Sequence, residues 1–366
     1  MTGPGPAVAE VRLAVRRALR ALLTEHPPCV LVACSGGADS VALAAATAFE
    51  APRLGVRAGL VTVDHGLQDG SHDRAAAVAD LGRQLGLRPV DVRRVTVGAD
   101  GGPEAAARTA RYAALRAALA AGGEPGVGGE PGVGGDRAAA TGRGGYVLLG
   151  HTLDDQAETV LLGLGRGSGP RSLAGMRPVD PPWLRPLLGV SRATTRAACR
   201  AEGLAIWDDP HNDDPRFTRV RLRREVLPLL EEVLQGGVAQ ALARTADLLR
   251  ADLDALDAIA AAALANSALA NSAPPGTALA RTALAGVHGL DAGALSGLDQ
   301  AVRRRAVRAW LLRRGVCGLT SAHLHAVDAL LMDWHGQGPV ALPGGLVAWR
   351  QRGRLQVGEP GSNLSG

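Results

Sequence analysis

Acidic and imidazole side chains gather in one short run, Gly150-His151-Thr152-Leu153-Asp154-Asp155-Gln156-Ala157-Glu158. On a helix, His151 and Asp155 (i, i+4) and Asp155 and Glu158 (i, i+3) would share one side. Clustered carboxylates suit a metal ion, an ammonium group, or removal of a proton from an amine. Because the helix dipole alone favours one or two acids in a first turn, that simpler explanation stands beside the catalytic one.

A second candidate is the small-residue turn Ser35-Gly36-Gly37-Ala38-Asp39-Ser40, which follows the apolar run Val30–Ala33. Two glycines permit a tight turn with exposed N–H groups, and a helix N-terminus behind it attracts phosphate. The Gly-Lys-Ser/Thr ending of a Walker A loop is absent. Asp39 would repel phosphates unless a cation such as Mg²⁺ lies between them. Without a ligand, Asp39 and Ser40 would only cap a helix.

Short apolar runs and helical patterns alternate in the first 150 residues and would position both motifs. Strands are predicted at 29–33, 56–63, 90–97 and 146–149, and helices at 40–50, 72–86 and 103–121. This order predicts an α/β fold with a doubly wound parallel sheet. Since ligands bind at the carboxyl ends of such strands, we expect the two motifs to meet there.

Three parts are predicted along the chain. Residues 1–222 form the nucleotide-binding catalytic domain, with a flexible Gly-rich insertion at 122–145. Residues 223–295 form a helical connecting or RNA-binding domain, and residues 296–366 form a small α+β domain with helices near 299–314 and 320–334. This last part holds nine Arg against four acids, a net charge of +5, which favours a polyanionic partner or an ordinary arginine-covered helix.

Composition excludes several classes of protein. The four cysteines, Cys29, Cys34, Cys199 and Cys317, are scattered and form no C-x-x-C pair, which argues against disulfide, iron–sulfur and Cys₄ zinc sites. No run suits a membrane span or a signal peptide, so we expect a cytoplasmic protein without a membrane partner. All 40 basic residues are arginine, and the chain contains no lysine.

Arginines and a histidine supply further candidate ligands. His65 follows the second predicted strand, and Arg108 and Arg111 share one face of the helix predicted at 103–121. Either arginine could hold a triphosphate or an RNA phosphate, although such residues are more often solvated surface charges. Downstream motifs are Arg185-Pro-Leu-Leu, Asp208-Asp-Pro-His-Asn212 and Arg219-Val-Arg-Leu-Arg223.

These motifs carry a family resemblance. Ser-Gly-Gly-x-Asp-Ser after a strand resembles the PP-loop ATP pyrophosphatases, which cleave ATP between its α and β phosphates. Gly-His-x-x-Asp-Asp-Gln-x-Glu-Thr and the motifs after it resemble the tRNA(Ile)-lysidine synthetases, in order and spacing through about residue 228. The chain departs from that family at Gln68, where arginine is usual, and at Val220, where asparagine is frequent.

The resemblance implies a two-step reaction. ATP would adenylate the C2 oxygen of the wobble cytidine in the CAU anticodon of tRNA(Ile), and free L-lysine would then displace AMP to form lysidine. Asp39 would help to hold Mg²⁺, and Asp155 and Glu158 would bind the lysine and act in catalysis with Asp39. ATP would contact Ser35, Gly36, Gly37, Ala38, Asp39, Ser40, His65, Arg108, Arg111 and Gly150. The tRNA would contact Arg185, Arg192, Arg219, Arg223, Arg304 and Arg308.

Two alternatives remain at this point. A PP-loop tRNA thiolase would share the fold, but it would generally need suitably placed cysteines or a cluster. A non-catalytic tRNA-binding protein would not need the acidic set of Asp39, Asp154, Asp155 and Glu158. The sequence leaves the oligomeric state open, and a homodimer is one of the states that it allows.

Overall fold

A computed structural model describes residues 3–23, 29–66, 70–96, 98, 103–122, 145–167, 169–209, 214–269 and 289–361. The chain divides into two compact units, Met1–Asp247 and Leu248–Gly366, and the boundary falls within helix α11 (Val238–Leu269). The three-part division expected from the sequence stays a prediction. Of the proposed flexible insertion at 122–145, residues 122–144 lie outside the residues whose side chains are described, as does Gln68.

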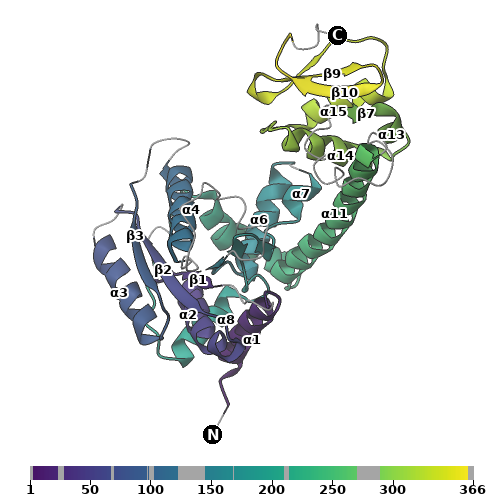
Figure 1. Ribbon diagram of the computed structural model, residues 1–366. Coiled ribbons are helices and arrows are strands. Elements are labelled where there is room, and N and C mark those ends of the chain that lie inside the picture. Colours follow the sequence, from purple (N-terminus) through teal and green to yellow (C-terminus); the bar gives the residue numbers. More distant parts are fainter. Residues whose placement is uncertain are drawn as a thin grey trace. The chain divides into compact units, whose positions relative to one another are not determined.

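The first unit contains a six-stranded sheet in the order β3-β2-β1-β4-β6-β5. Figure 1 shows β3, β2 and β1 side by side. All neighbours are parallel except the last pair, β5 and β6. The strands are β1 (Val30–Ala33), β2 (Ala58–Asp64), β3 (Val90–Arg94), β4 (Tyr146–Leu149), β5 (Val179–Asp180) and β6 (Trp183–Leu184). The expected doubly wound parallel sheet is confirmed, and its first four strands match the predicted runs to within three residues.

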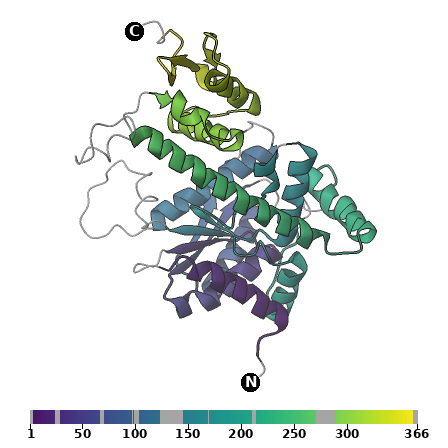
Figure 2. The same cartoon turned by 90° about the vertical axis from the view of Figure 1, so that its right-hand side faces the viewer.

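Helices cover both faces of this sheet (Figure 2). On one face, apolar side chains of β1 and β2 join those of α1 (Pro6–Arg20), α2 (Ala38–Glu50), α3 (Ser71–Gln84) and α8 (Arg192–Ala201) in one core. On the other face, Leu31, Val61 and Val147 pack with Leu115 and Ala118 of α4 (Pro103–Gly122). The alternating residues of β1 therefore point to opposite cores, as a sheet buried on both faces requires.

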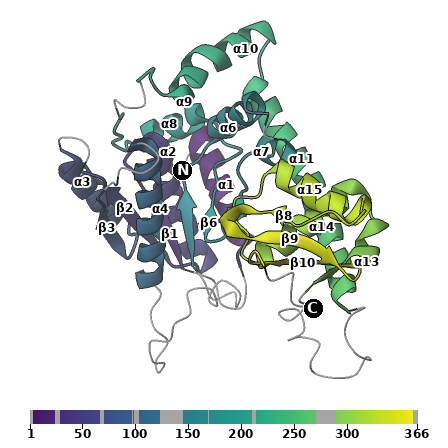
Figure 3. The same ribbon diagram turned by 90° about the horizontal axis from the view of Figure 1, so that it is seen from above.

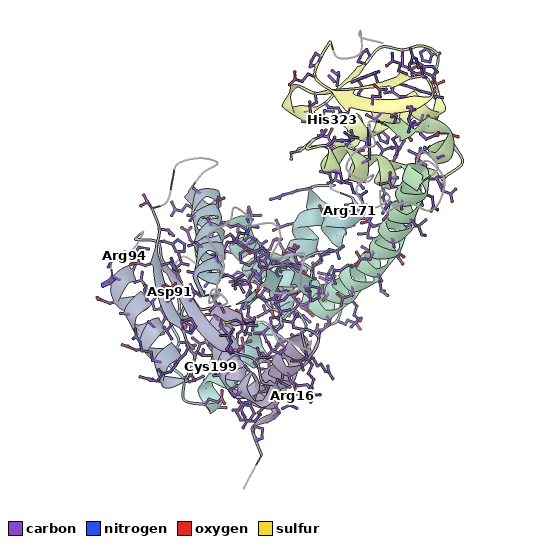
Figure 4. The ribbon with its side chains drawn as sticks, viewed as in Figure 1. Arg16, Asp91, Arg94, Arg171, Cys199 and His323 are labelled. Atoms are coloured by element: carbon purple, nitrogen blue, oxygen red, sulfur yellow. The ribbon has the colours of Figure 1, made fainter. Side chains whose placement is uncertain are left out.

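α8 is anchored to α2 directly behind the glycine-rich turn. Cys199 on α8, labelled in Figure 4, is buried and its thiol donates a hydrogen bond to the backbone carbonyl of Ala38 at 3.4 Å. At the same end of α8, Arg12 of α1 pairs with Glu202, the C-cap residue, at 2.5 Å. These contacts hold the last turn of α8 against α1 and the start of α2.

Helical segments complete the first unit. After α6 (Leu153–Gly165) and α7 (Pro170–Leu173), the chain returns through the β5–β6 hairpin and α8 to α9 (Thr218–Arg221), a π-helical turn (Leu222–Val226) and α10 (Leu227–Val233). Figure 3 shows α9 and α10 beyond α6 and α8. A π-helical turn often marks a functional segment, and this one carries Arg223.

The second unit packs helices against a small antiparallel sheet in the order β7-β10-β9-β8. Its elements after α11 are β7 (Leu290–Asp291), α13 (Ala292–Ser296), α14 (Gln300–Arg313), α15 (Ser321–Met332), β8 (Val340–Ala341), β9 (Val347–Gln351) and β10 (Arg354–Gly358). The expected small α+β domain is confirmed. No helix among the described residues is both long enough and apolar enough to cross a membrane.

Candidate active site

A cavity of about 790 Å³ opens at the carboxyl ends of three neighbouring strands. Its wall includes residues that directly follow β1, β2 and β4, among them Ser35, His65 and Gly150. The two motifs singled out in the sequence therefore meet at one sheet edge, as predicted. The following sequence-predicted residues line the cavity: Ser35, Gly37, Ala38, Asp39, Ser40, His65, Arg111, Gly150, Asp155, Arg192 and Arg223.

The glycine-rich turn is held from within by Ser40. The Ser40 hydroxyl accepts a hydrogen bond from the backbone N–H of Ser35 at 3.1 Å and donates one to the Gly37 carbonyl at 2.9 Å. Gly36 has φ +88°, a left-handed conformation that favours glycine. These bonds tie the turn to the first residues of α2, so Ser40 supports the loop that was expected to bind phosphate.

Gly150 lets β4 approach the start of α2. A Cβ atom at Gly150 would lie 3.1 Å from the backbone carbon of Asp39 and from the nitrogen of Ser40. Any larger residue would press on the phosphate loop. The glycine thus has a positional reason to stand at the end of β4.

Helix α6 begins at Leu153, two residues after His151, which the sequence had placed within the first helical turn. Thr152 is the N-cap, and it forms a capping box with Asp155, whose Oδ2 accepts hydrogen bonds from Thr152 N–H at 2.8 Å and Thr152 Oγ1 at 2.9 Å. His151 therefore lies before the helix, and the expectation that it shares a helical face with Asp155 is wrong. Asp155 and Glu158 do point to one side, where they meet arginines from distant segments.

Arg192, the first residue of α8, bridges three carboxylates. Its Nη2 lies 2.8 Å from Asp155 Oδ1 and 3.5 Å from Glu158 Oε1, and its Nε lies 3.6 Å from Asp39 Oδ2. Its backbone N–H donates to Asp154 Oδ2 at 2.8 Å. Burial alone would lower the pKa of Arg192, but the surrounding acids outweigh it and raise that pKa, so the guanidinium stays charged.

Two more arginines reach Glu158, which is fully buried. Arg223 Nε donates to Glu158 Oε1 at 2.9 Å, and Arg219 Nη1 lies 4.0 Å from Oε2. A buried carboxylate needs such partners because an unpaired buried charge is strongly unfavourable. Arg192, Arg219 and Arg223 were expected to contact tRNA, and their positions beside the acids do not favour that role.

Burial and neighbouring charges shift Asp39 and Asp155 in opposite directions. Burial raises the pKa of Asp39, and this effect exceeds the opposing hydrogen bond from Thr195 and the charge of Arg192. Burial would also raise the pKa of Asp155, but Arg192 and the bonds from Thr152 outweigh it and lower that pKa. Asp155 is thus held as a carboxylate, whereas Asp39 needs a further positive charge to be equally stable when ionised.

Two histidines at the cavity, His65 and His151, lie close to arginines. Burial, helped by the charges of Arg185, Arg111 and Arg108, lowers the pKa of His151 to about 4, although Asp155 opposes the shift. Burial and Arg111 also lower the pKa of His65. Both imidazoles are therefore neutral near pH 7, and each has a buried Nδ1 that finds no hydrogen-bond partner among the described residues.

Five expected ligands of the first unit lie outside the cavity lining: Gly36, Arg108, Glu158, Arg185 and Arg219. Glu158 is fully buried behind Asp155 and reaches the cavity only through the arginines that pair with it. Arg108 donates to the Tyr112 hydroxyl at 3.4 Å and stacks on that ring. Arg185 is only 8% exposed, and its Nη1 donates to the Arg177 carbonyl at 2.8 Å. Gly36 shapes the turn but does not face the cavity. The predicted contacts of Arg108 with ATP and of Arg185 with tRNA therefore receive no support from their positions.

In the second unit, Arg304 is engaged in an ion pair whereas Arg308 is not, within the described residues. Arg303 and Arg304 both pair with Asp328 of α15, at 2.6 Å and 3.0 Å, and Arg303 and Asp328 are buried. This pairing ties α14 to α15 and gives Arg304 a structural role. Arg308 forms no ion pair within the described part of the chain, so it remains the better candidate for contact with RNA. His323 (Figure 4) caps α15 together with Thr320.

Sequence reasoning missed two groups that shape the site. The Thr195 hydroxyl, fully buried and one turn after Arg192, makes a short hydrogen bond to Asp39 Oδ1. Trp207 donates its backbone N–H to the Gly36 carbonyl at 2.9 Å, and Arg74 stacks on its ring at 4.3 Å. The helical spacing of Thr195 from Arg192 was the one available signal for the first group. Val220, which stands where the family frequently has asparagine, is 6% exposed and packs inward as an apolar side chain.

Asp39 is placed to serve as the protein ligand of a Mg²⁺ ion that is bound together with a nucleotide. In the described ranges, no three His, Cys, Asp or Glu side chains are grouped so as to hold a metal ion by themselves. Mg²⁺ commonly takes one or two carboxylates together with substrate phosphates and water. Asp39, 24% exposed and directly behind the phosphate loop, provides such a carboxylate.

Comparisons with known proteins agree with this geometry. Residues 11–124 and 136–230 match the PP-loop domain family, and residues 290–356 match the TilS substrate binding domain. A tRNA(Ile)-lysidine synthase of Streptomyces coelicolor is 51% identical, covering 97% of this chain and 99% of the relative. That of Thermobifida fusca is 50% identical over 98% and 99%, and that of Salinispora tropica is 50% identical over the whole of both chains.

The likeness runs through almost the whole length of each relative. The structure agrees with it in having a parallel sheet, a glycine-rich turn at the edge of that sheet and an acidic helix start at the same cavity. The structure and the sequence comparisons lead to one conclusion: the chain belongs to the tRNA(Ile)-lysidine synthase family and is an ATP-dependent ligase.

Proposed function

We propose that this chain joins free L-lysine to C2 of the wobble cytidine in the CAU anticodon of tRNA(Ile), in the cytoplasm. The observation that carries this proposal is that the glycine-rich turn and Asp155, in the first turn of α6, line one cavity. A nucleotide and an amine can then be held within reach of the same base. Positioning of this kind accounts for much of the catalysis of group transfer.

In the first step, the C2 oxygen of the cytidine attacks the α-phosphorus of ATP, and pyrophosphate leaves. The backbone N–H groups of the turn at 35–37 and the start of α2 bind the phosphates. Arg111 and the neutral His65 and His151 face the same cavity, where they can donate hydrogen bonds to phosphate or base oxygens. Bound Mg²⁺ would neutralise phosphate charge, with Asp39 as its protein ligand.

In the second step, the ε-amine of lysine attacks C2, and AMP leaves with the C2 oxygen. Lysine arrives as an ammonium ion and must lose a proton before it attacks. Asp155 and Glu158 lie on one side of α6 and suit an ammonium group, and a carboxylate there can accept the proton. The product carries lysine in place of the C2 oxygen.

The test is incubation of the enzyme with ATP, Mg²⁺, labelled lysine and total tRNA. We expect the label to enter a single isoleucine tRNA, with AMP formed in equal amount. Asp39→Asn should reduce pyrophosphate release about 100-fold or more and leave tRNA binding intact. Full activity of that variant would remove Asp39 from the metal site, and a mass gain from sulfur instead of lysine would show a thiolase.

A further inference from the structure

Arg192 contacts the carboxylates that the proposed function assigns to two different substrates. Asp39 is assigned to the nucleotide and its metal, and Asp155 and Glu158 are assigned to lysine. The Arg192 guanidinium lies 2.8 Å, 3.5 Å and 3.6 Å from oxygens of Asp155, Glu158 and Asp39, respectively. One side chain therefore spans both subsites.

The backbone of Arg192 is fixed, whereas its side chain is long. Ser191 caps α8, and the Arg192 N–H is bonded to Asp154. Thr195, one turn later, holds Asp39. The guanidinium is 18% exposed and faces the cavity, so it can change partners without moving the helix.

An ammonium group cannot share Asp155 with this guanidinium at low cost. The Asp155 carboxylate already accepts hydrogen bonds from Thr152 N–H, Thr152 Oγ1 and Arg192 Nη2, which leaves about one of its four lone-pair sites. A second positive charge beside the guanidinium would also be repelled strongly, because the site is largely shielded from water. Lysine can bind well only when Arg192 has moved away.

Nucleotide phosphates offer Arg192 a competing partner. Its Nε already lies 3.6 Å from Asp39, which directly follows the phosphate loop. Phosphate accepts two parallel hydrogen bonds from a guanidinium and binds it more strongly than a single carboxylate contact does. Moving toward the loop would therefore preserve the charge pairing of Arg192 and release Asp155, since Glu158 keeps Arg223 as its partner.

We propose that Arg192 is a positioning residue that makes lysine binding depend on bound nucleotide. In the nucleotide-free enzyme it neutralises Asp155 and Glu158 and excludes the ammonium group of lysine. When nucleotide binds, Arg192 turns to the phosphates and Asp155 becomes available, while Glu158 stays paired with Arg223 behind it. The inference rests on the proposed function and adds an order of binding to it.

The experiment is calorimetric titration of lysine into the full chain, with and without Mg²⁺ and an ATP analogue whose α–β bridge is methylene. We expect lysine to bind about tenfold or more tightly when the analogue is present, within the usual range of coupling between sites. In Arg192→Gln, lysine should bind the nucleotide-free enzyme more tightly than it binds the nucleotide-free wild type. The ratio of the lysine affinities with and without the analogue should fall toward one. Arg200→Gln, an exposed arginine on the same helix, should keep the wild-type ratio.

The wild-type comparison decides the proposal even if Arg192→Gln fails to fold. Equal lysine affinity in both states would overturn it, and so would binding that is detected only after tRNA is added. Assaying labelled-lysine incorporation with the same enzyme separates the two ideas. If label enters tRNA while the lysine affinity ignores nucleotide, only the role of Arg192 fails; if label never enters tRNA, the proposed function fails.

Discussion

Individual side chains in this site are paired with charges that lie far away in the sequence. Glu158 on α6 is completed by Arg223 from the π-helical turn and by Arg192 from α8. None of these pairs follows from helical spacing, because the partners are 34 and 65 residues from Glu158. The acids could be predicted from the sequence as a cluster, whereas the arginines that neutralise them could not.

Glu158 gives a test at the scale of one residue. Replacing it with glutamine removes one of the charges proposed to hold the lysine ammonium while it keeps the shape. We expect Glu158→Gln to slow transfer of lysine at least about tenfold more than it slows adenylation. Single-turnover measurements of pyrophosphate release and of lysidine formation separate the steps.

A matched control is Glu225→Gln, because Glu225 pairs with Arg221 on an exposed helical surface. It should leave both steps unchanged. If Glu158→Gln slowed both steps to the same degree, Glu158 would support the site as a whole and would not act on the amine.

His151 gives a test in stability. Its pKa is lowered to about 4 in the folded protein, whereas an unfolded chain would protonate near pH 6.5. The unfolded state therefore binds the extra proton first, so stability is complete above pH 6.5 and falls as the pH drops toward 4. Between pH 7.5 and pH 5 the wild type should lose about 2 kcal/mol through this group.

The measurement is urea unfolding of the first unit at both pH values, followed by tryptophan fluorescence. His151→Asn should lose about 2 kcal/mol less than the wild type over this interval. The same pH dependence in both proteins would mean that His151 is protonated in the folded state as readily as in the unfolded state.

At the scale of elements, long periodic segments were predictable and short ones were not. Residues of β1, β2 and β4 are nearly all apolar, which is typical of strands buried on both faces. The β5–β6 hairpin was missed because each strand has only two residues and carries no period. The start of α6 was misplaced because a threonine cap, and not the histidine before it, sets the helix boundary.

The end of β4 gives a test at this scale. Gly150→Ala should push Asp39 and Ser40 away from the strand, since its Cβ would lie 3.1 Å from their backbone. We expect a loss of about 1–3 kcal/mol of stability, together with weaker ATP binding. Thermal unfolding and nucleotide titration measure the two effects.

Gly165→Ala is the control. Gly165 ends α6 without a positive φ, and a Cβ there would meet no atom within 4 Å. It should be neutral or slightly stabilising. If Gly150→Ala behaved like Gly165→Ala, the close approach of β4 to the phosphate loop would have no consequence for ATP.

At the scale of the whole molecule, the net charge of the chain resides in its last part. The nine arginines and four acids of residues 296–366 account for the full +5 of the protein. Composition could predict this excess, but it could not reveal that Arg303 and Arg304 are engaged by Asp328. The charge available to a polyanion is therefore smaller than the count of arginines suggests.

Salt dependence tests whether the arginines of residues 296–366 bind tRNA phosphates. tRNA affinity should fall steeply with salt concentration, because phosphate contacts release counterions. Arg308→Gln should reduce the slope of log affinity against log salt by about 1. Arg53→Gln, an exposed arginine of the first unit outside the cavity, should leave the slope unchanged, and a flat profile for the wild type would argue against an RNA-binding surface.

The choice of arginine at position 192 has a chemical consequence beyond charge. Its guanidinium lies where the attacking amine of the substrate is proposed to lie, yet it keeps its proton and is a poor nucleophile. A lysine there could be deprotonated and could attack the adenylated cytidine itself. We expect Arg192→Lys to become covalently cross-linked to tRNA with release of AMP, seen as a protein–RNA adduct that survives denaturing electrophoresis. Because the chain contains no lysine, it has no side-chain amine that could compete with the free amino acid in this way.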